Sequence, residues 1–215
     1  MVEIPLILKL KKKMHKDIAT AQDIVIKEIY NIFNNALLHG GTAIWRCYKG
    51  NRFSDDIDIY IPKKEKKLNN LFKNLEKKGF IIKKKKISKN SLFSVLKFNR
   101  IIVRLEALFK KPAPKGILKE YETVEGNLII INTLSPEEII KEKIDAYLKR
   151  YKIRDLYDIF FLLKEIKNKK TISKNLQRLI INFKKPVNEK ELKNLIIEGL
   201  VPNTEKMLMY IKRAL

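Results

Sequence analysis

Residues 39–61 read HGGTAIWRCYKGNRFSDDIDIYI, and this stretch decides the fold. Its final part, Ser54 to Ile61, alternates polar residues, among them Asp56 and Asp58, with isoleucines. A period of two is typical of a strand with one buried face. Paired glycines break the chain near the start of the stretch, and Thr42–Tyr48 is expected to form a short helix. The stretch therefore predicts a helix followed by a strand that carries two carboxylates on one face.

Apolar periodicity predicts further elements on both sides of this stretch. One helix is expected over residues 16–38, and a lysine-rich amphipathic helix over Glu65–Lys78. We expect strands at Phe80–Lys86, Ser91–Phe98, Ile101–Phe109 and Leu128–Ile131. The rest is helical in pattern, with a helix that starts at Ser135-Pro136 and others at Ile153–Lys167, Ile172–Phe183, Asn188–Leu200 and Asn203–Leu215. Prolines and glycines at 110–134 predict a boundary there, which gives domains 1–125 and 126–215.

Composition narrows the class of protein. The 215 residues carry a formal net charge of +23, and this excess favours a phosphate-bearing partner such as nucleic acid. The alternative is a lysine bias that an AT-rich genome or a heat-adapted proteome imposes. Cys47 is the single cysteine, so an intramolecular disulfide is excluded. No apolar run approaches the roughly 20 residues that span a bilayer. We therefore expect a cytoplasmic protein without a membrane partner.

The acidic residues of the first half are unevenly placed. Residues 1–110 contain 25 Lys and Arg but 10 Asp and Glu, and three of these ten fall within residues 55–58. Asp56 and Asp58 would lie roughly 6.5 to 7 Å apart along one strand face, close enough to share a site. Their repulsion would be relieved by a divalent cation, and hard carboxylate ligands favour Mg²⁺ or Mn²⁺. The alternative is a solvated strand face.

A third carboxylate is expected from a neighbouring strand. In the segment Ile101–Phe109, Glu106 is expected on a face that it shares with Ile102, Arg104 and Leu108. Glu106 is therefore a candidate third metal ligand. A surface salt bridge between Glu106 and Arg104 is the competing interpretation.

Residues near the two aspartates could bind a phosphate group. Gly40-Gly41 would let the backbone approach an anion closely, and a helix that starts near Thr42 would aim its amide groups at it. An ordinary tight turn is the alternative. Arg52 and Ser54 offer a cation and a hydroxyl just ahead of the carboxylates.

The helical half offers a complementary set of charges. Lys143 and Arg150 are seven residues apart and so lie on one helix face. Asp155 and Asp158 lie together on the next helix, where Arg154 is expected to reach Asp158. A free lysine and an orienting acid would complete a nucleoside triphosphate (NTP) site across the domain cleft. Plain salt bridges between the helices are the alternative.

Four motifs together resemble a known family. In order they are LHGGTAI at 38–44, RFSDDID at 52–58, LSPEE at 134–138 with Glu142-Lys143, and KIRDLYD at 152–158. This set is similar to the AbiEii/MenT nucleotidyltransferases, and the resemblance covers roughly residues 16–166. Thr42 stands where wider relatives often have serine, which keeps the hydroxyl.

The resemblance implies a fold and a chemistry. It implies an α+β fold, in which a DNA polymerase β-like core with a mixed sheet and flanking helices is followed by a C-terminal helical domain. Asp56 and Asp58 would bind metal, and Lys143 and Asp158 would serve the nucleotide site. Some members are toxins of toxin–antitoxin pairs that add nucleotides to the 3′ end of tRNA, so an antitoxin is a possible partner.

The leading hypothesis is a metal-dependent nucleotidyl transfer. Mg²⁺ on Asp56 and Asp58, with Glu106 as a third ligand, would activate an RNA 3′-hydroxyl for attack on the α-phosphate of an NTP. Transfer to a protein hydroxyl is one rival. A non-catalytic nucleic-acid-binding protein that keeps the fold is another.

Overall fold

A mixed seven-stranded sheet forms the centre of the molecule in the computed structural model, which describes residues 4–110 and 113–215. The strand order is β3-β4-β5-β2-β1-β7-β6. Strands β2 and β5 run parallel, as do β1 and β7, and the remaining neighbours are antiparallel. The strands are β1 (Leu37–His39), β2 (Asp56–Tyr60), β3 (Phe80–Ile87), β4 (Ser91–Phe98), β5 (Ile101–Leu108), β6 (Ile117–Glu122) and β7 (Leu128–Thr133).

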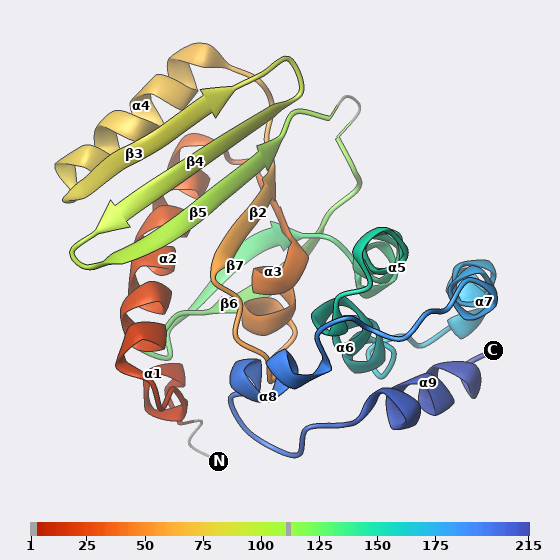
Figure 1. Ribbon diagram of the computed structural model, residues 1–215. Coiled ribbons are helices and arrows are strands. Elements are labelled where there is room, and N and C mark those ends of the chain that lie inside the picture. Colours follow the sequence, from red (N-terminus) through yellow and green to blue (C-terminus); the bar gives the residue numbers. More distant parts are fainter. Residues whose placement is uncertain (1–3, 111–112) are drawn as a thin grey trace.

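Two long helices cover one face of the β3–β5 part of this sheet. Helix α2 (Lys13–Ile32) packs on β5, and α4 (Glu65–Lys77) packs on β3 and on α2. Both pass behind these strands in Figure 1. Their apolar faces are buried, with Val25 and Ile29 of α2 and Leu68 and Leu75 of α4 fully inaccessible. Such amphipathic helices gain most of their stability from packing rather than from propensity.

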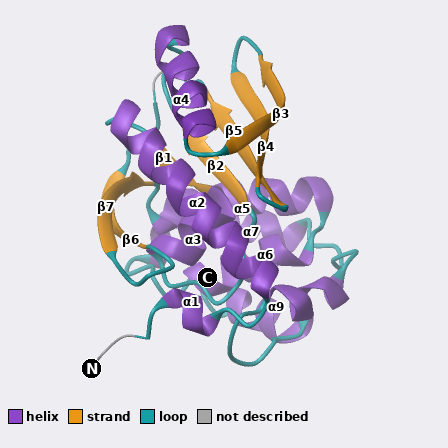
Figure 2. Ribbon diagram, turned by 90° about the vertical axis from the view of Figure 1, so that its left-hand side faces the viewer, coloured by secondary structure: helices purple, strands orange, loops and turns teal. Residues whose placement is uncertain are grey.

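The C-terminal half is helical. Helices α5 (Pro136–Arg150), α6 (Ile153–Leu162), α7 (Ser173–Ile181) and α9 (Thr204–Lys212) lie together, apart from the β3–β5 strands (Figure 2). Helix α5 starts as its sequence predicts, because Ser135 Oγ accepts a hydrogen bond from the Glu138 amide and Pro136 occupies the first turn. An α+β fold with a mixed sheet and a C-terminal helical region is confirmed. None of the described helices is long and apolar enough to cross a bilayer.

Three predicted elements differ from the structure. The helix expected over residues 16–38 ends at Ile32, and residues 37–39 form the short central strand β1. A strand of three residues is too short to show a period in the sequence. Strand β6 occupies part of the expected junction at 110–134. The helix expected at Asn188–Leu200 is reduced to a 3₁₀ turn (Glu189–Glu191) and one turn of α8 (Leu192–Leu195).

This last difference has a tertiary cause. The Phe53 amide donates to the Leu195 carbonyl, and the Ile197 amide donates to the Asn51 carbonyl, both at 2.8 Å. Ile196 also forms a β-bridge with Arg52. These bonds use the Leu195 carbonyl and the Ile197 amide, which a continuing helix would need for its own hydrogen bonds. The expected domain boundary is a separate point. Strand β7 belongs to the sheet, so the sheet extends to Thr133, beyond the expected boundary at residue 125. The division of the chain into domains 1–125 and 126–215 stays a prediction.

The remaining short helices complete the core. Helix α1 (Leu6–Lys9) sits near the N-terminus, and α3 (Gly40–Cys47) follows β1 directly. Every residue of α3 is buried, including Arg46. Its guanidinium pairs with Asp23 of α2 and lies 4.8 Å from the centroid of the Tyr121 ring on β6. Asp23 also accepts bonds from the Tyr121 hydroxyl and the Val124 amide, each at 2.8 Å.

Asp23→Ala should lower the free energy of unfolding by about 3–5 kcal/mol, since it leaves the Arg46 charge buried without its partner. Urea denaturation followed by circular dichroism measures this loss. Asp17→Ala, at an exposed position of the same helix, should change stability by less than about 0.5 kcal/mol. Equal losses in the two variants would contradict this role of Asp23.

Candidate active site

Three carboxylates share one face of the sheet. Asp56 and Asp58 alternate along β2 with Ile57 and Ile59, which are completely buried on the opposite face. Glu106 of β5 lies directly opposite Asp58 in the parallel ladder. The sequence-based placement of these side chains on one face therefore agrees with the strand register.

Arg104 of β5 lies beside the first of these carboxylates. Its Nε donates to Asp56 Oδ1, and one terminal nitrogen lies 3.2 Å from Asp55 Oδ2. Burial, followed by the charge of Asp55, nevertheless raises the pKa of Asp56 above its usual range. Burial together with Asp58 likewise raises the pKa of Glu106. This corner of the sheet is therefore rich in negative charge that one arginine offsets only in part.

The carboxylates are not arranged as a ready-made metal centre. Within residues 4–110 and 113–215, no three His, Cys, Asp or Glu side chains lie close enough together to hold a metal ion. Asp56 and Asp58 still offer the oxygen donors that Mg²⁺ and Mn²⁺ prefer. Arg104 contacts Oδ1 of Asp56, so a metal at this carboxylate would bind the other oxygen or displace Arg104.

The glycine pair allows the start of α3 to lie close to side chains of β2 and of the loop before it. Gly40 has φ +71°, and a Cβ atom there would overlap Asp58 Oδ2 and lie 2.8 Å from its Cγ. A Cβ atom on Gly41 would lie 2.6 Å from Ser54 Oγ and 2.7 Å from an Arg52 nitrogen. Side chains at these positions would push the site residues apart, so the start of α3 must be glycine.

The hydroxyl of Thr42 has a structural partner. It is fully buried and donates to the Asp56 carbonyl, which fastens α3 to the start of β2. The Ser54 carbonyl is held in a similar way, by the Gln22 side-chain amide at 3.0 Å. Thr42 thus fixes the backbone that carries the carboxylates, while the Ser54 hydroxyl faces the Gly41 backbone.

A buried ion network joins the strand half to the helical half. Arg52 donates through Nε and a terminal nitrogen to the two oxygens of Asp158 on α6, both at 2.8 Å. Lys143 of α5 lies 2.7 Å from Asp158 Oδ2 and 3.7 Å from Asp155 Oδ1. Arg150 makes two bonds of 2.8 Å to Asp155. Three cations therefore share two carboxylates.

The electrostatics of this network favour the charged forms. Burial alone would raise the pKa of Asp158, but the opposite charges of Arg52 and Lys143 lower it below its usual value. Asp158 retains 1% of its accessible surface, so its carboxylate can orient Arg52 and Lys143 but does not face solvent. Sequence spacing had paired Asp158 with Arg154, whereas the structure pairs it with Arg52.

A second cluster fixes the position of α5 against the sheet. Glu142 accepts a bond of 2.5 Å from the Tyr60 hydroxyl and contacts His39 Nδ1 at 2.9 Å. The His39 and Tyr60 rings stack with centroids 4.1 Å apart. Because Glu142 precedes Lys143, this cluster also places the lysine relative to β2.

A cleft of about 240 Å³ lies between these parts. On the sheet side it is lined by Gly41, Arg52, Ser54, Asp56, Asp58, Arg104 and Glu106, and on the helical side by Lys143, Arg150 and Arg154. Cations thus face carboxylates across a polar space. Such a space suits an anion with several phosphates together with a divalent cation.

The predicted site residues divide into two groups. Seven of them line the cleft, namely Gly41, Arg52, Ser54, Asp56, Asp58, Glu106 and Lys143. Gly40, Thr42, Asp155 and Asp158 lie behind these and hold them in place. Lys143 is ion-paired rather than free. The sequence pairs Arg104 only with Glu106, and no sequence pattern reveals its bond to Asp56.

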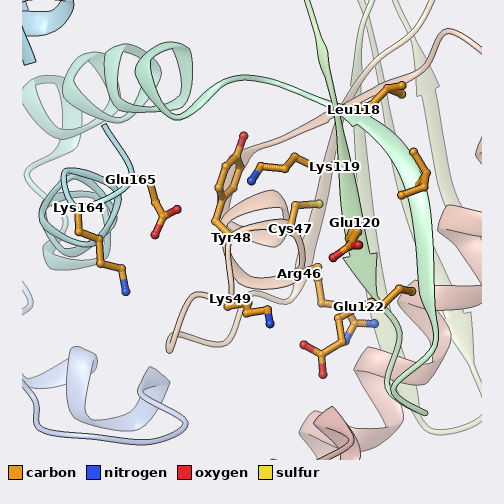
Figure 3. Close-up of a pocket in the computed structure, with 12 residues that line it drawn as sticks. Arg46, Cys47, Tyr48, Lys49, Leu118, Lys119, Glu120, Glu122, Lys164 and Glu165 are labelled. Carbon is orange, nitrogen blue, oxygen red and sulfur yellow. The ribbon is translucent and has the colours of Figure 1, made fainter. Parts of the chain in front are cut away.

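A larger pocket of about 560 Å³ lies elsewhere, between α3, β6 and the end of α6 (Figure 3). It contains none of the predicted site residues. Cys47 lines it, but burial raises the pKa of this thiol to about 12, so the thiol stays protonated near neutral pH and is a poor nucleophile. This pocket therefore offers no activated cysteine nucleophile.

Gly40→Ala should destabilise the protein by at least about 1 kcal/mol more than Gly79→Ala does, because overpacking adds to backbone strain. Both glycines have positive φ, but a Cβ atom on Gly79 meets nothing closer than 3.7 Å. Chemical denaturation of the two variants gives the comparison. Equal losses of stability in the two variants would mean that the Asp58 side chain moves aside without an energetic cost.

Asp158→Asn should cost about 3 kcal/mol of stability at pH 7, since it leaves Arg52 buried without its counter-charge. The folded-state pKa of Asp158 is below the unfolded value of about 3.9, so its contribution is present above that pH and is lost as the pH falls through the folded pKa. The difference in the free energy of unfolding between wild type and variant should therefore become smaller below about pH 4. Denaturant unfolding across this range measures it.

Asp145→Asn is the matched control. This aspartate also pairs with an arginine, Arg178, but its side chain is 67% exposed. The variant should behave like wild type at every pH. A constant gap for Asp158→Asn from neutral to acidic pH would show that its charge is not what stabilises the network.

Solved structures share this fold. MenT4, a nucleotidyltransferase toxin from Mycobacterium tuberculosis, superposes with a TM-score of 0.65 at 16% identity, over 93% of this chain and 82% of that one. JHP933 from Helicobacter pylori gives 0.63 at 20% identity, over 94% and 90%. The antibiotic-resistance factor ANT(2'')-Ia gives 0.50 at 15% identity, over 77% and 94%. These likenesses establish the fold.

Sequence comparison establishes the family. Among curated proteins, no sequence matches this chain. A family profile described as "Nucleotidyl transferase AbiEii toxin, Type IV TA system" matches residues 29–208, which include the glycine pair, both β2 aspartates and the whole ion network. The chain therefore belongs to the AbiEii nucleotidyltransferase toxin family of type IV toxin–antitoxin systems.

Proposed function

We propose that this nucleotidyltransferase moves a nucleoside monophosphate from an NTP to the 3′ end of tRNA or another RNA, with Mg²⁺ or Mn²⁺ as cofactor. One observation carries the proposal. The cleft places Asp56 and Asp58 of the sheet opposite Lys143, Arg150 and Arg154 of the helical half. Carboxylates of the kind that bind divalent metals and cations of the kind that bind phosphates thus line one space from separate parts of the chain.

The donor set on β2 fits a divalent cation. Asp56 and Asp58 would hold it, with Glu106 of the adjacent strand as a third ligand. The raised pKa of Asp56 reflects burial among like charges, which a cation would relieve. When bound, the metal would neutralise charge that develops on the reacting phosphate and on the attacking oxygen.

The cations of the cleft would hold the triphosphate. Lys143 and Arg52 are fixed by Asp158, and Arg150 is fixed by Asp155, so these groups are oriented before a nucleotide arrives. Arg154 lines the same cleft from the first turn of α6. The Gly41 backbone would come close to phosphate oxygens, since no Cβ atom intervenes.

The reaction would be an in-line displacement. The acceptor hydroxyl oxygen bonds to the α-phosphorus as the bond to the bridging oxygen breaks, pyrophosphate leaves, and the hydroxyl proton passes to solvent. The net charge of +23 supports a polyanionic acceptor rather than a protein hydroxyl. Membership of a toxin family further suggests that an antitoxin opposes this activity.

Wild-type protein incubated with labelled NTPs, Mg²⁺ and total tRNA should transfer label to RNA, and EDTA should prevent it. Asp56→Asn with Asp58→Asn should reduce transfer more than about a hundredfold, since metal ligation contributes several kcal/mol to catalysis. Gel electrophoresis and scintillation counting report the label. Asp55→Asn, whose side chain is 48% exposed, is the neighbouring control and should retain most of the activity.

Two results would contradict the proposal. Equal labelling by the wild type and the double variant would exclude these aspartates from the reaction. Label that appears on protein instead of RNA would identify a protein hydroxyl as the acceptor.

A further inference from the structure

One face of strands β3–β5 is left open by the helices. Helices α2 and α4 cover the other face, where Leu92, Leu96 and Leu105 are buried. On the open face, Ile81 and Ile102 keep 55% and 53% of their accessible surface. This open face continues without interruption into β2, and so into the cleft.

Two rows of side chains cross this open face from the sheet edge to the two aspartates. The strand registers pair Lys84 with Val95, Val95 with Arg104, and Arg104 with Asp56. The neighbouring row is formed by Lys86, Phe93, Glu106 and Asp58. Directly opposed residues share a face, so each row begins with a lysine and ends with one of the site aspartates. Three strand spacings separate the two ends, or about 14 Å.

The lysines of β3 do not all point the same way. Lys85 lies on the helix side, where its ammonium is 4.3 Å from the centroid of the Phe72 ring and 3.3 Å from Asn69 Oδ1 of α4. Lys84 lies on the open face, with its ammonium 5.5 Å from the centroid of the Phe93 ring. A β-bulge between Ile82 and Lys84 sets this alternation.

The composition of the open face fits a nucleic-acid strand. Phe93 is half-buried and offers a ring surface between Lys86 and Glu106, while Lys84 and Arg104 add positive charge in the adjacent row. Aromatic side chains interleaved with cations are how proteins hold unpaired nucleotides, by stacking on bases and pairing with phosphates. Glu106 is the one acid that β3–β5 contribute to these two rows, and it lies next to Asp58.

We infer that this open face, formed by Lys84, Lys86 and Phe93 with Arg104, binds the unpaired 3′ end of the acceptor RNA and directs it toward Asp56 and Asp58. Phe93 stacks on a base, and the two lysines contact phosphates. The inference rests on the proposed function, because it assigns the acceptor side of the same site. An unpaired strand is required, since the bases of a duplex have no free face for Phe93.

Fluorescence anisotropy with a labelled single-stranded RNA of about ten nucleotides, without NTP or divalent metal, tests this surface. Lys84→Gln with Lys86→Gln should make the negative slope of log affinity against log salt concentration shallower by about 1.4, or 0.7 for each phosphate that is no longer neutralised. Lys85→Gln removes one positive charge from the same strand but from the other face, and it should leave the slope nearly unchanged.

Phe93→Leu should weaken binding of this RNA roughly tenfold, because base stacking is removed while an apolar side chain remains. A blunt RNA duplex should bind wild type and Phe93→Leu equally. Thermal melts of the variants confirm that each is folded. Identical changes of salt slope in the Lys84/Lys86 and Lys85 variants would overturn the inference. An affinity for single-stranded RNA that Phe93→Leu leaves unchanged would also overturn it.

Failure of this inference can be told apart from failure of the proposed function. The Asp56→Asn, Asp58→Asn protein lacks the catalytic carboxylates but should bind the RNA at least as tightly as wild type. Normal RNA binding without label transfer would refute the function and leave the surface intact. Label transfer with the same KM for RNA in the Lys84/Lys86 and Lys85 variants would refute the surface and leave the function intact.

Discussion

The bidentate ion pair between Arg52 and Asp158 is the interaction on which the rest of the site depends. It joins a loop of the sheet half to a helix of the other half, across 106 residues of sequence. Both partners are almost completely buried, so neither charge can be left without the other. Lys143 completes the arrangement by contacting the same carboxylate, which ties α5 and α6 to the strand that carries the aspartates. The cleft exists because this contact holds its two walls together.

A second constraint is steric. Asp58 fills the space where a Gly40 side chain would be, and Ser54 and Arg52 do the same for Gly41. The backbone of the glycine pair and the carboxylates can therefore meet within one short segment of chain. The buried hydroxyl of Thr42 adds a bond that aligns α3 with β2, so the residues that do not face the cleft are as necessary to its geometry as those that do.

Much of this site was predictable from local pattern. The alternation of residues 54–61 gave the orientation of Asp56 and Asp58, and the alternation of 101–109 placed Glu106 beside them, because period two fixes which face a side chain takes. Pairing between distant charges was not predictable. Arg154 has the helical spacing to pair with Asp158, but Arg52 is the residue that pairs with it. No spacing within one helix indicates a contact with a residue of a separate element. The helix expected at Asn188–Leu200 was wrong for a similar reason, because hydrogen bonds to residues 51 and 53 outweigh local propensity.

Those hydrogen bonds also bear on when the site can form. The loop that carries Arg52 is held on one side by Asp158 and on the other by the backbone of residues 195–197, which leave the ribosome long after the loop itself. Contacts of such high sequence separation form late, after the intervening chain has been ordered. A growing chain that has not yet reached these residues therefore has its glycine turn, its two aspartates and Asp158, but lacks the backbone hydrogen bonds that hold the other side of the Arg52 loop. The Arg52 loop is therefore held on both sides only after residues 195–197 have been synthesised.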